Sequence, residues 1–206
     1  MSEVSNATYH WLKQRITTMP KDESTFLTEA AVAEESGASR TPVREAIMRL
    51  EAEGLVERIP KRGAFVPPLS DTEIRSVMRA REMIELWAVD EFLLRPRPEA
   101  TERLDAIIAA QESAIADPER FIELDSDLHG LIVGVGSNKV VEHFYAELRD
   151  RQIRMGLHAV KASTGRSGHV LGEHRAIVDA LRAGDRDAAR TATSAHLART
   201  LEVMLS

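Results

Sequence analysis

The sequence predicts a mostly α-helical protein in two parts, an N-terminal winged helix-turn-helix over residues 1–67 and a C-terminal all-α bundle of six helices over residues 68–206. The first part holds three short helical patterns followed by two short apolar runs around a Pro-Lys-Arg-Gly turn, which is the order of a winged helix. After Pro67-Pro68 the apolar residues recur at helical spacing, and no segment alternates as a half-buried strand would. The first part is therefore expected to combine α-helices with a small β-hairpin, and the second to contain helices alone.

Two helices are expected to open the N-terminal part. Residues 5–19 place apolar side chains on one helical face, at Trp11, Leu12, Ile16 and Met19. Thr28 is a residue type that caps helices, and Gly37 readily takes the left-handed conformation that ends them. The second helix should therefore lie between these two positions and lead into a short turn.

The third helix is predicted from Pro42 to Glu53. Proline fits the first helical position because its missing N–H would have no partner there, Thr41 can act as the cap, and Gly54 can end the helix. Four apolar residues recur at helical spacing and should be buried: Val43, Ala46, Ile47 and Leu50.

Two short apolar strands are expected after this helix, over residues 55–59 and 64–66, with Pro60-Lys-Arg-Gly63 as the tip of their hairpin. Ser70-Asp-Thr-Glu73 has the pattern of a capping box, and we expect it to open the first helix of the second part. Breaks at residues 96–98, 117–118, 134–137, 162–168 and 184–185 then divide the remainder into six helices.

The composition limits the class of protein. The chain has 206 residues, no cysteine and a net charge of −6. The lack of cysteine excludes a disulfide framework and a Cys-based zinc finger. No apolar run is long enough for a membrane span and the N-terminus lacks a signal-peptide pattern, so we expect a soluble, cytoplasmic protein with no membrane partner.

Basic residues gather between Ser39 and Gly63 although the whole chain is acidic. In a helix-turn-helix the N-terminal end of the recognition helix meets base edges and phosphates of duplex DNA, and we expect the wing tip to meet phosphates or the minor groove. The candidate DNA contacts are therefore Ser39, Arg40, Thr41, Arg44, Lys61, Arg62 and Gly63, the glycine for its backbone geometry.

A second group of polar residues falls on apolar helical faces of the C-terminal part. Asp125 and His129 are four residues apart and share one face of a helix. His174 and His196 lie at similar distances on either side of the Gly184 turn, so they should reach the same height in an antiparallel pair of helices. Four such groups would be costly to bury without partners, and one metal ion would satisfy all of them.

Three imidazoles and one carboxylate suit a divalent transition metal. We expect zinc first, with nickel, manganese or iron as alternatives. The competing interpretation is that each histidine is a hydrogen-bonded core residue, which is the usual state of a single histidine on an apolar face.

Together these features resemble a GntR-superfamily transcription regulator of the FadR type with an FCD effector domain, over nearly the whole chain. The N-terminal resemblance rests on Ser-Arg-Thr-Pro-Val-Arg-Glu-Ala at residues 39–46 and on Arg-Gly-Ala-Phe-Val at residues 62–66. The C-terminal resemblance rests on Arg81 with Glu85, on the Asp and His residues named above, and on Asn138. Six effector helices are closer to the shorter, VanR-like branch. Ala30 departs from the pattern, because the family often has a DNA-contacting arginine there.

This resemblance implies a ligand-responsive repressor that binds a pseudo-palindromic DNA operator as a homodimer. It also implies a metal-containing pocket formed by Asp125, His129, His174 and His196, at or near which a small carboxylate effector would bind. Arg81 would hold the effector carboxylate, or would instead form an internal ion pair with the nearby glutamate.

Other functions are compatible with parts of the sequence. A metal sensor would use the ion itself as the signal, and a metalloenzyme would use a metal-bound water on the same four residues. An enzyme leaves the winged helix unexplained, so we expect no enzymatic activity. A winged helix used only for protein contacts is disfavoured by the placement of Arg40 and Arg44.

Overall fold

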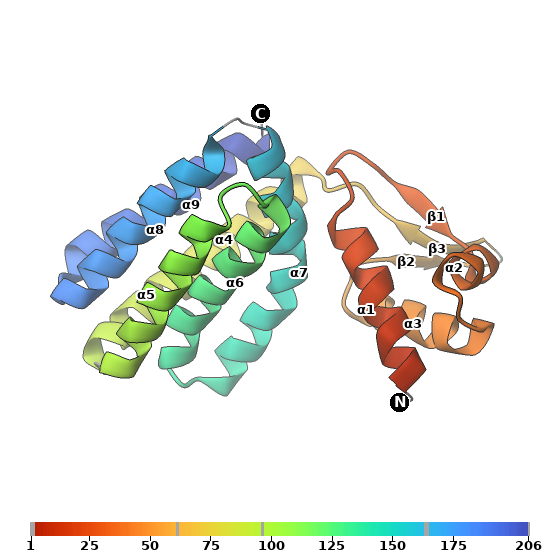
Figure 1. Ribbon diagram of the computed structural model, residues 1–206, viewed down its shortest axis with the longest axis horizontal. Helices are drawn as coiled ribbons and strands as arrows, with labels where there is room; N and C mark the ends of the chain where they lie inside the picture. Colours follow the sequence, from red (N-terminus) through yellow and green to blue (C-terminus); the bar gives the residue numbers. More distant parts are fainter. Residues whose placement is uncertain (1–2, 61, 96, 163–164, 206) are drawn as a thin grey trace. The chain divides into compact units, whose positions relative to one another are not determined.

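The computed structural model describes residues 3–60, 62–95, 97–162 and 165–205, and the chain divides into two compact units, residues 1–70 and 71–206 (Figure 1). The first unit combines helices with a small sheet, which confirms the predicted winged helix-turn-helix. Its elements are α1 (Glu3–Thr17), β1 (Thr25–Leu27), α2 (Glu29–Ser36), α3 (Arg40–Ala52), β2 (Glu57–Ile59) and β3 (Gly63–Val66).

The sheet has the strand order β1-β3-β2, and both strand pairs are antiparallel. Strands β2 and β3 form the predicted hairpin, whereas β1 was not among the predicted strands. Phe26 of β1 lies across from Phe65 of β3, and their ring centroids are 4.9 Å apart. Three residues with one buried side chain are too few to show the alternation that identifies a strand in sequence.

The start of α3 differs from the prediction. The helix begins at Arg40 with Ser39 as its N-cap residue, so the expectation that Thr41 caps a helix starting at Pro42 is wrong. Pro42 is tolerated two residues further in, because the N–H groups of the whole first turn have no partner within the helix. The predicted buried stripe is confirmed, since the side chains of Val43, Ala46, Ile47 and Leu50 are all buried.

The end of α3 explains why β2 is shorter than expected. Gly54 has a φ of 71°, and the N–H of Leu55 donates to the carbonyl of Leu50 at 2.9 Å. This is the hydrogen bond of a glycine-terminated helix, and it fixes Leu55 in the closing turn. The strand therefore starts at Glu57 and not at Leu55.

Helix α2 has the predicted ends. The hydroxyl of Thr28 accepts a hydrogen bond from the N–H of Ala31 at 3.2 Å, and Gly37 has a φ of 67°. The three helices and the sheet enclose one apolar core, which includes Leu12, Ile16, Val32, Val43, Leu50 and Val66.

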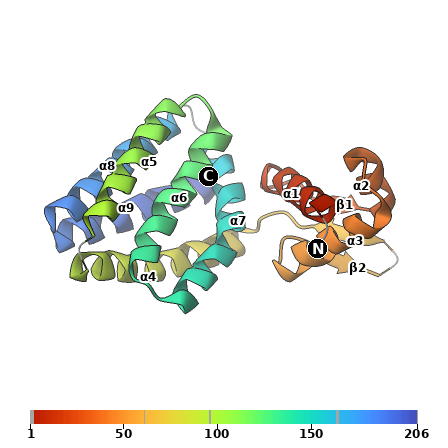
Figure 2. The same cartoon turned by 60° about the horizontal axis from the view of Figure 1, so that its bottom comes forward.

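The described residues of the second unit form helices joined by short turns, with no strand, which confirms the predicted six-helix bundle (Figure 2). Its elements are α4 (Asp71–Leu94), α5 (Pro98–Ser113), α6 (Pro118–Val135), α7 (Lys139–Ala162), α8 (Arg166–Ala183) and α9 (Arg186–Leu205). Helix α6 packs against α4, α5 and α7, while α9 packs against α4 and α8. Gly184 has a φ of 70° in the tight turn between α8 and α9, which run antiparallel side by side (Figures 1 and 2).

Among the described residues, no helix is both long and apolar enough to cross a lipid bilayer.

Candidate metal centre and nucleic-acid interface

Three imidazoles and one carboxylate converge in the helical unit. Asp125 and His129 come from α6, His174 from α8 and His196 from α9, and one ligand atom from each lies within 4.8 Å of the others. The imidazole centroids are 4.8 to 5.1 Å apart. The three histidines are buried and Asp125 is half-buried, with its Oδ1 3.2 Å from Nε2 of His174. The structure thus brings the four predicted residues together.

Each imidazole has an acceptor oxygen next to its Nδ1 atom. The distances are 2.9 Å from His129 to Glu85, 2.8 Å from His174 to Gln111 and 2.7 Å from His196 to Glu173. An acceptor at Nδ1 favours the tautomer with the proton on Nδ1, which leaves a lone pair on Nε2.

The three Nε2 atoms are buried and have no hydrogen-bond partner. Buried polar atoms in proteins are nearly always paired, so three orphaned nitrogens directed at one point need an explanation. Neutral imidazoles oriented through their other nitrogen are the usual ligands of transition metals. The donor set and the orphaned atoms therefore both fit a divalent ion, and a core of separately hydrogen-bonded histidines does not account for them.

The electrostatics keep these ligands in the metal-binding form. Burial lowers the pKa of His174, and it lowers the pKa of His196 to about 4, so both imidazoles are neutral near pH 7. Burial alone would raise the pKa of Asp125, but the close contact with the His174 ring and the charge of Arg81 hold that pKa well below its usual range. The cluster offers three nitrogen lone pairs and one carboxylate.

Glu85 is bonded on several sides. Its Oε1 accepts hydrogen bonds from Nε of Arg81 and from the hydroxyl of Tyr145, each at 2.8 Å. Burial would raise the pKa of Glu85, but the charge of Arg81 and the contact with His129 hold it well below its usual range. Burial and the Glu85 charge raise the pKa of Tyr145 well above its ordinary value, so this tyrosine stays a donor.

Arg81 was predicted either to pair internally or to hold an effector. The structure contains the internal pair with Glu85, and it leaves the Nη2 atom of Arg81 buried without a hydrogen-bond partner. Arg81 also lines a small cavity together with Asp125 and His196. The position of Arg81 is therefore compatible both with the internal ion pair and with contact to an effector.

Glu173 has the same role beside His196. It is buried and accepts hydrogen bonds from Arg166 at 3.1 Å and from Nε of Arg199 at 2.8 Å. Burial opposes ionisation, but the bond from His196 and the charge of Arg166 lower the pKa of Glu173 to about 2.

Sequence reasoning did not identify the residues that orient the imidazoles through Nδ1. Gln111 could have been found, because it is a polar residue at a position where the helical spacing of Leu104, Ile107 and Ile108 predicts an apolar one. Glu173 could not, because its partners His196 and Arg199 lie on the next helix, α9.

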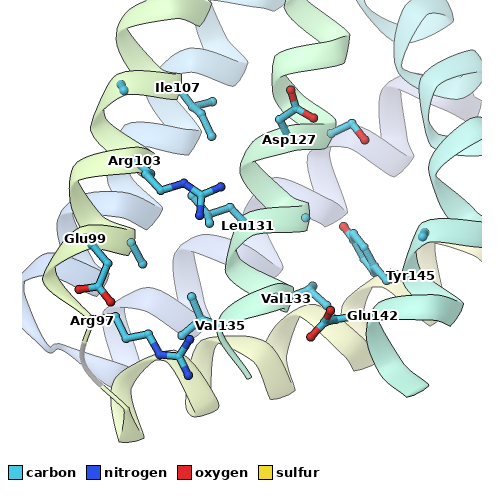
Figure 3. A pocket seen from close by; sticks show the side chains of 16 residues that line it. Arg97, Glu99, Arg103, Ile107, Asp127, Leu131, Val133, Val135, Glu142 and Tyr145 are labelled. Carbon is cyan, nitrogen blue, oxygen red and sulfur yellow. The ribbon is translucent and has the colours of Figure 1, made fainter. Parts of the chain in front are cut away.

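A larger groove lies on the other side of α6, lined by α5, α6 and α7, with a volume of about 940 Å³. Figure 3 shows Arg97 and Arg103 on one wall and Glu142 and Tyr145 on the other. Asp127 and Leu131 of α6 face this groove, whereas the metal-ligand candidates of the same helix face the imidazole cluster. Tyr145 belongs to both places, because its hydroxyl donates to Glu85.

In the winged unit the predicted DNA contacts are exposed at the start of α3. Ser39, Arg40, Thr41 and Arg44 are all exposed. The Nε and Nη2 atoms of Arg44 donate to the two carboxylate oxygens of Glu29, each at 2.7 Å. Glu29 is the first residue of α2, directly before Ala30, the position at which the family pattern often has an arginine.

The wing contributes Arg62 and Gly63. The guanidinium of Arg62 lies 5.1 Å from the ring centroid of Phe26. Gly63 has a φ of 105°, and a Cβ atom added there would lie 2.4 Å from the carbonyl oxygen of Leu27. Glycine is therefore required at this position by both backbone conformation and space. Lys61 lies outside the described residues.

Comparison with known families gives two matches that together span most of the chain. Residues 4–66 match the bacterial regulatory proteins of the gntR family, and residues 76–199 match the FCD domain.

Three curated relatives are transcription regulators. An HTH-type regulator from an unstable DNA locus of Streptomyces ambofaciens is 31% identical over 192 residues, which cover 92% of this chain and 80% of the relative. The HTH-type repressor RspR of Escherichia coli is 27% identical, covering 94% and 86%. The galactonate operon repressor of the same species is 26% identical, covering 80% of each chain.

Among solved structures, Escherichia coli McbR/YncC superposes with a TM-score of 0.80 over 100% of this chain and 98% of its own, at 20% identity. At this identity the likeness concerns the fold.

Proposed function

This chain belongs to the gntR family of bacterial regulatory proteins and carries an FCD domain, and on that premise we propose that it is an acid-responsive repressor. It is a transcription regulator and not an enzyme. In our proposal two copies bind a pseudo-palindromic operator, and a small organic acid that enters the helical unit releases them. The convergence of three orphaned imidazole nitrogens on one point carries the effector part of this proposal.

Asp125, His129, His174 and His196 would hold the ion, with zinc as the first candidate. When bound, such an ion would supply two positive charges and would leave room for a carboxylate of the effector. The galactonate operon repressor is named for the operon of a carboxylic acid, which supports an acid as the class of effector. As a DNA-binding regulator the protein would act in the cytoplasm.

For the operator, we assign base and phosphate contacts to the exposed start of α3, at Ser39, Arg40, Thr41 and Arg44. Lys61, Arg62 and Gly63 are assigned to the wing contact, Lys61 from sequence alone. Arg44 must either leave Glu29 or carry it along when DNA binds, because a carboxylate beside phosphates is repelled.

For the homodimer, we propose the outer face of α4 and α7 as the surface that meets the second copy. The ion pair of Arg151 with Glu73 and the bond of Tyr145 to Glu85 show that these helices run antiparallel side by side. These two helices carry three large apolar side chains, Met83, Val140 and Phe144, that are 57–70% exposed. Exposed large apolar side chains on neighbouring helices favour burial against a partner.

Sedimentation of Phe144→Glu tests this surface. The variant should be monomeric at concentrations at which the parent protein is a dimer, while Ile115→Glu, at an exposed apolar position beyond the end of α5, should remain dimeric. A dimeric Phe144→Glu protein would move the interface elsewhere.

The function as a whole is tested by DNA binding of the full chain to its own upstream region, at fixed salt. The comparison has three arms: zinc-loaded protein, zinc-loaded protein with small carboxylates, and chelated protein. We expect specific binding that one acid weakens, and loss of this response in His174→Ala but not in His169→Ala, an exposed histidine on the same helix. By linkage, the acid must bind the DNA-free form more tightly than the DNA-bound form.

Two outcomes would contradict the proposal. If DNA binding follows the zinc concentration with no effect of any acid, the protein is a metal sensor. If no specific DNA binding occurs in any arm, the operator assignment fails.

A further inference from the structure

Phe26 is a large apolar residue of the winged unit that the core does not explain. Burial alternates along β1, where Leu27 faces the core and Phe26 is 47% exposed. Phe26 lies across from Phe65 on the same face of the sheet, and their ring centroids are 4.9 Å apart. The outer face of the sheet therefore carries a pair of aromatic rings, one of which is only half covered.

The wing places Arg62 beside this exposed ring. Its guanidinium carbon lies 5.1 Å from the ring centroid of Phe26, which is within the reach of a cation–π contact. The position follows from the backbone, since the N–H of Arg62 donates to the carbonyl of Ile59 at 3.0 Å and the missing side chain of Gly63 lets β3 approach Leu27 closely. In the part of the chain that the structure describes, the Arg62 side chain forms no hydrogen bond and no ion pair. Contact with the ring of Phe26 therefore decides where this guanidinium lies.

This contact leaves the hydrogen-bonding groups of Arg62 free. A guanidinium is planar and its five N–H donors point outward in that plane, while an aromatic ring over it covers only one side. Two parallel N–H groups match two oxygens of a phosphate. An arginine held by a ring also has fewer conformations to lose when it binds, so the binding costs less entropy. The arrangement suits a cation that meets an anion at its edge.

Arg62 also borders a groove between α3 and the hairpin of β2 and β3, with a volume of about 580 Å³. Glu51 of α3 and Arg58 of β2 lie on its walls and form an ion pair at 3.7 Å. Glu29, which pairs with Arg44, lines the same groove. Among the described residues of this groove, Arg62 is a cation without a carboxylate partner, and it lies beside the part of α3 that is assigned to DNA.

We propose that Phe26 is a positioning residue for operator binding, which holds the Arg62 guanidinium so that its edge meets a phosphate of the DNA backbone. A phosphate contact carries no base information, so Phe26 supports affinity and register and not base preference. An aromatic ring is required, because an aliphatic side chain lacks the negative face that attracts a cation. This inference rests on the proposed function, because it assumes that the wing lies against the operator.

Fluorescence anisotropy of the full chain on a labelled fragment of its own upstream region, over a series of salt concentrations, tests the inference. Arg62→Met should weaken binding and reduce the slope of log Kd against log salt by about one, as expected for one lost phosphate contact. Phe26→Leu should weaken binding severalfold and change the slope in the same direction. In the Arg62→Met background Phe26→Leu should have no further effect, because the ring acts through the arginine.

Two further variants separate positioning from support of the sheet. Phe65→Leu removes the same pair of rings but leaves Phe26 beside Arg62. It should lower the stability in urea as Phe26→Leu does, and it should keep the affinity and the salt slope of the parent. Phe26→Tyr retains an aromatic face, so its affinity and salt slope should also equal those of the parent.

Equal affinity of Phe26→Leu and the parent, with weak binding by Arg62→Met, would overturn the inference and leave the wing contact in place. Equal weakening by Phe26→Leu and Phe65→Leu would also overturn it, because loss of sheet packing would then account for both. If Arg62→Met binds as the parent does, the inference fails together with the assignment of Arg62 to DNA, while the contacts of α3 remain. Absence of specific binding by the parent would overturn the proposed function and the inference with it.

Discussion

Gln111 is the residue at which the metal assignment can be tested most directly. Its side chain is fully buried on α5, its Oε1 is 2.8 Å from Nδ1 of His174, and its Nε2 donates to the carbonyl of Phe121 at 3.4 Å. The bond to Phe121 fixes the orientation of the amide, so the oxygen faces the imidazole. Gln111→Leu keeps the volume and removes both contacts.

The structure gives the size of two separate effects. Leaving the Nδ1–H of His174 without an acceptor should destabilise the fold by about 1–3 kcal/mol, with a smaller contribution from the long bond to Phe121. Loss of the acceptor also frees the tautomer and the ring orientation of His174, and such changes weaken metal binding by roughly 10- to 100-fold. The second effect is expected only if the imidazole is a ligand.

The assay is a zinc competition titration against a coloured chelator, together with urea unfolding of chelated protein. Thr193→Val is the control, because it removes a buried hydroxyl whose bond, at 2.9 Å, goes to the carbonyl of Ala189 in its own helix. We expect this control to keep the zinc affinity of the parent. If Gln111→Leu loses stability but binds zinc as tightly as Thr193→Val does, the contact at Nδ1 has no bearing on metal binding and the reasoning is refuted.

Arg44→Ala should weaken operator binding by roughly ten- to a hundredfold in fluorescence anisotropy at fixed salt, and Glu29→Gln should strengthen it, with the gain absent in the Arg44→Ala background. Gly63→Ala should destabilise the winged unit by about 2 kcal/mol or more in urea, because its Cβ would lie 2.4 Å from the carbonyl oxygen of Leu27. Chelated protein should lose stability as the pH falls from about 6.5 toward 4, with a slope of about 1.4 kcal/mol per pH unit for His196 and a further loss in the same direction from His174. The sign follows from burial, which lowers the pKa of His196 to about 4, so that the unfolded chain takes up the proton first.

These predictions have internal controls. Gly37 also has a positive φ, but a Cβ atom added there meets no atom within 4 Å. Gly37→Ala should therefore destabilise the winged unit less than Gly63→Ala does. The two tryptophans, Trp11 and Trp87, lie one in each unit, and a Trp87→Phe background lets fluorescence follow the winged unit alone. If Glu29→Gln also increases operator affinity in the Arg44→Ala background, the effect comes from general repulsion between Glu29 and DNA. A flat pH dependence between 4 and 6.5 would contradict burial of neutral histidines.

The four metal-ligand candidates could be predicted from sequence because their positions follow from helix geometry. The four-residue spacing puts Asp125 and His129 on one face, and the Gly184 turn brings His174 and His196 to the same height. These are local rules applied to long helices, and no knowledge of the remaining bundle is needed.

The contacts that orient these ligands could not be predicted in the same way. Gln111 and Glu85 reach their histidines from other helices, α5 and α4, and which helices become neighbours is decided by packing of the whole bundle. Strand β1 was missed for a related reason, because its three residues become a strand only by pairing with β3. Tertiary structure decides both, and a single sequence does not display it.

In the proposed function, helix α4 would connect the effector site to the winged unit, and Tyr145 allows this connection to be tested. The helix begins at Asp71, directly after the first unit, and carries Arg81 and Glu85 roughly 15 and 21 Å along its length at 1.5 Å per residue. The carboxylate of Glu85 contacts Arg81, His129 and the Tyr145 hydroxyl.

In Tyr145→Phe, Glu85 loses one of these donors and should bind Arg81 more tightly, so that Arg81 becomes a poorer partner for an acid. The acid concentration at which half of the DNA is released should then rise severalfold, because weaker acid binding weakens the coupled release of DNA. The DNA affinity without acid should stay the same, because Tyr145 is not among the residues assigned to DNA contacts. A Tyr145→Phe protein that binds DNA more weakly without acid, and responds to acid as the parent does, would show that α4 does not carry the signal through Glu85.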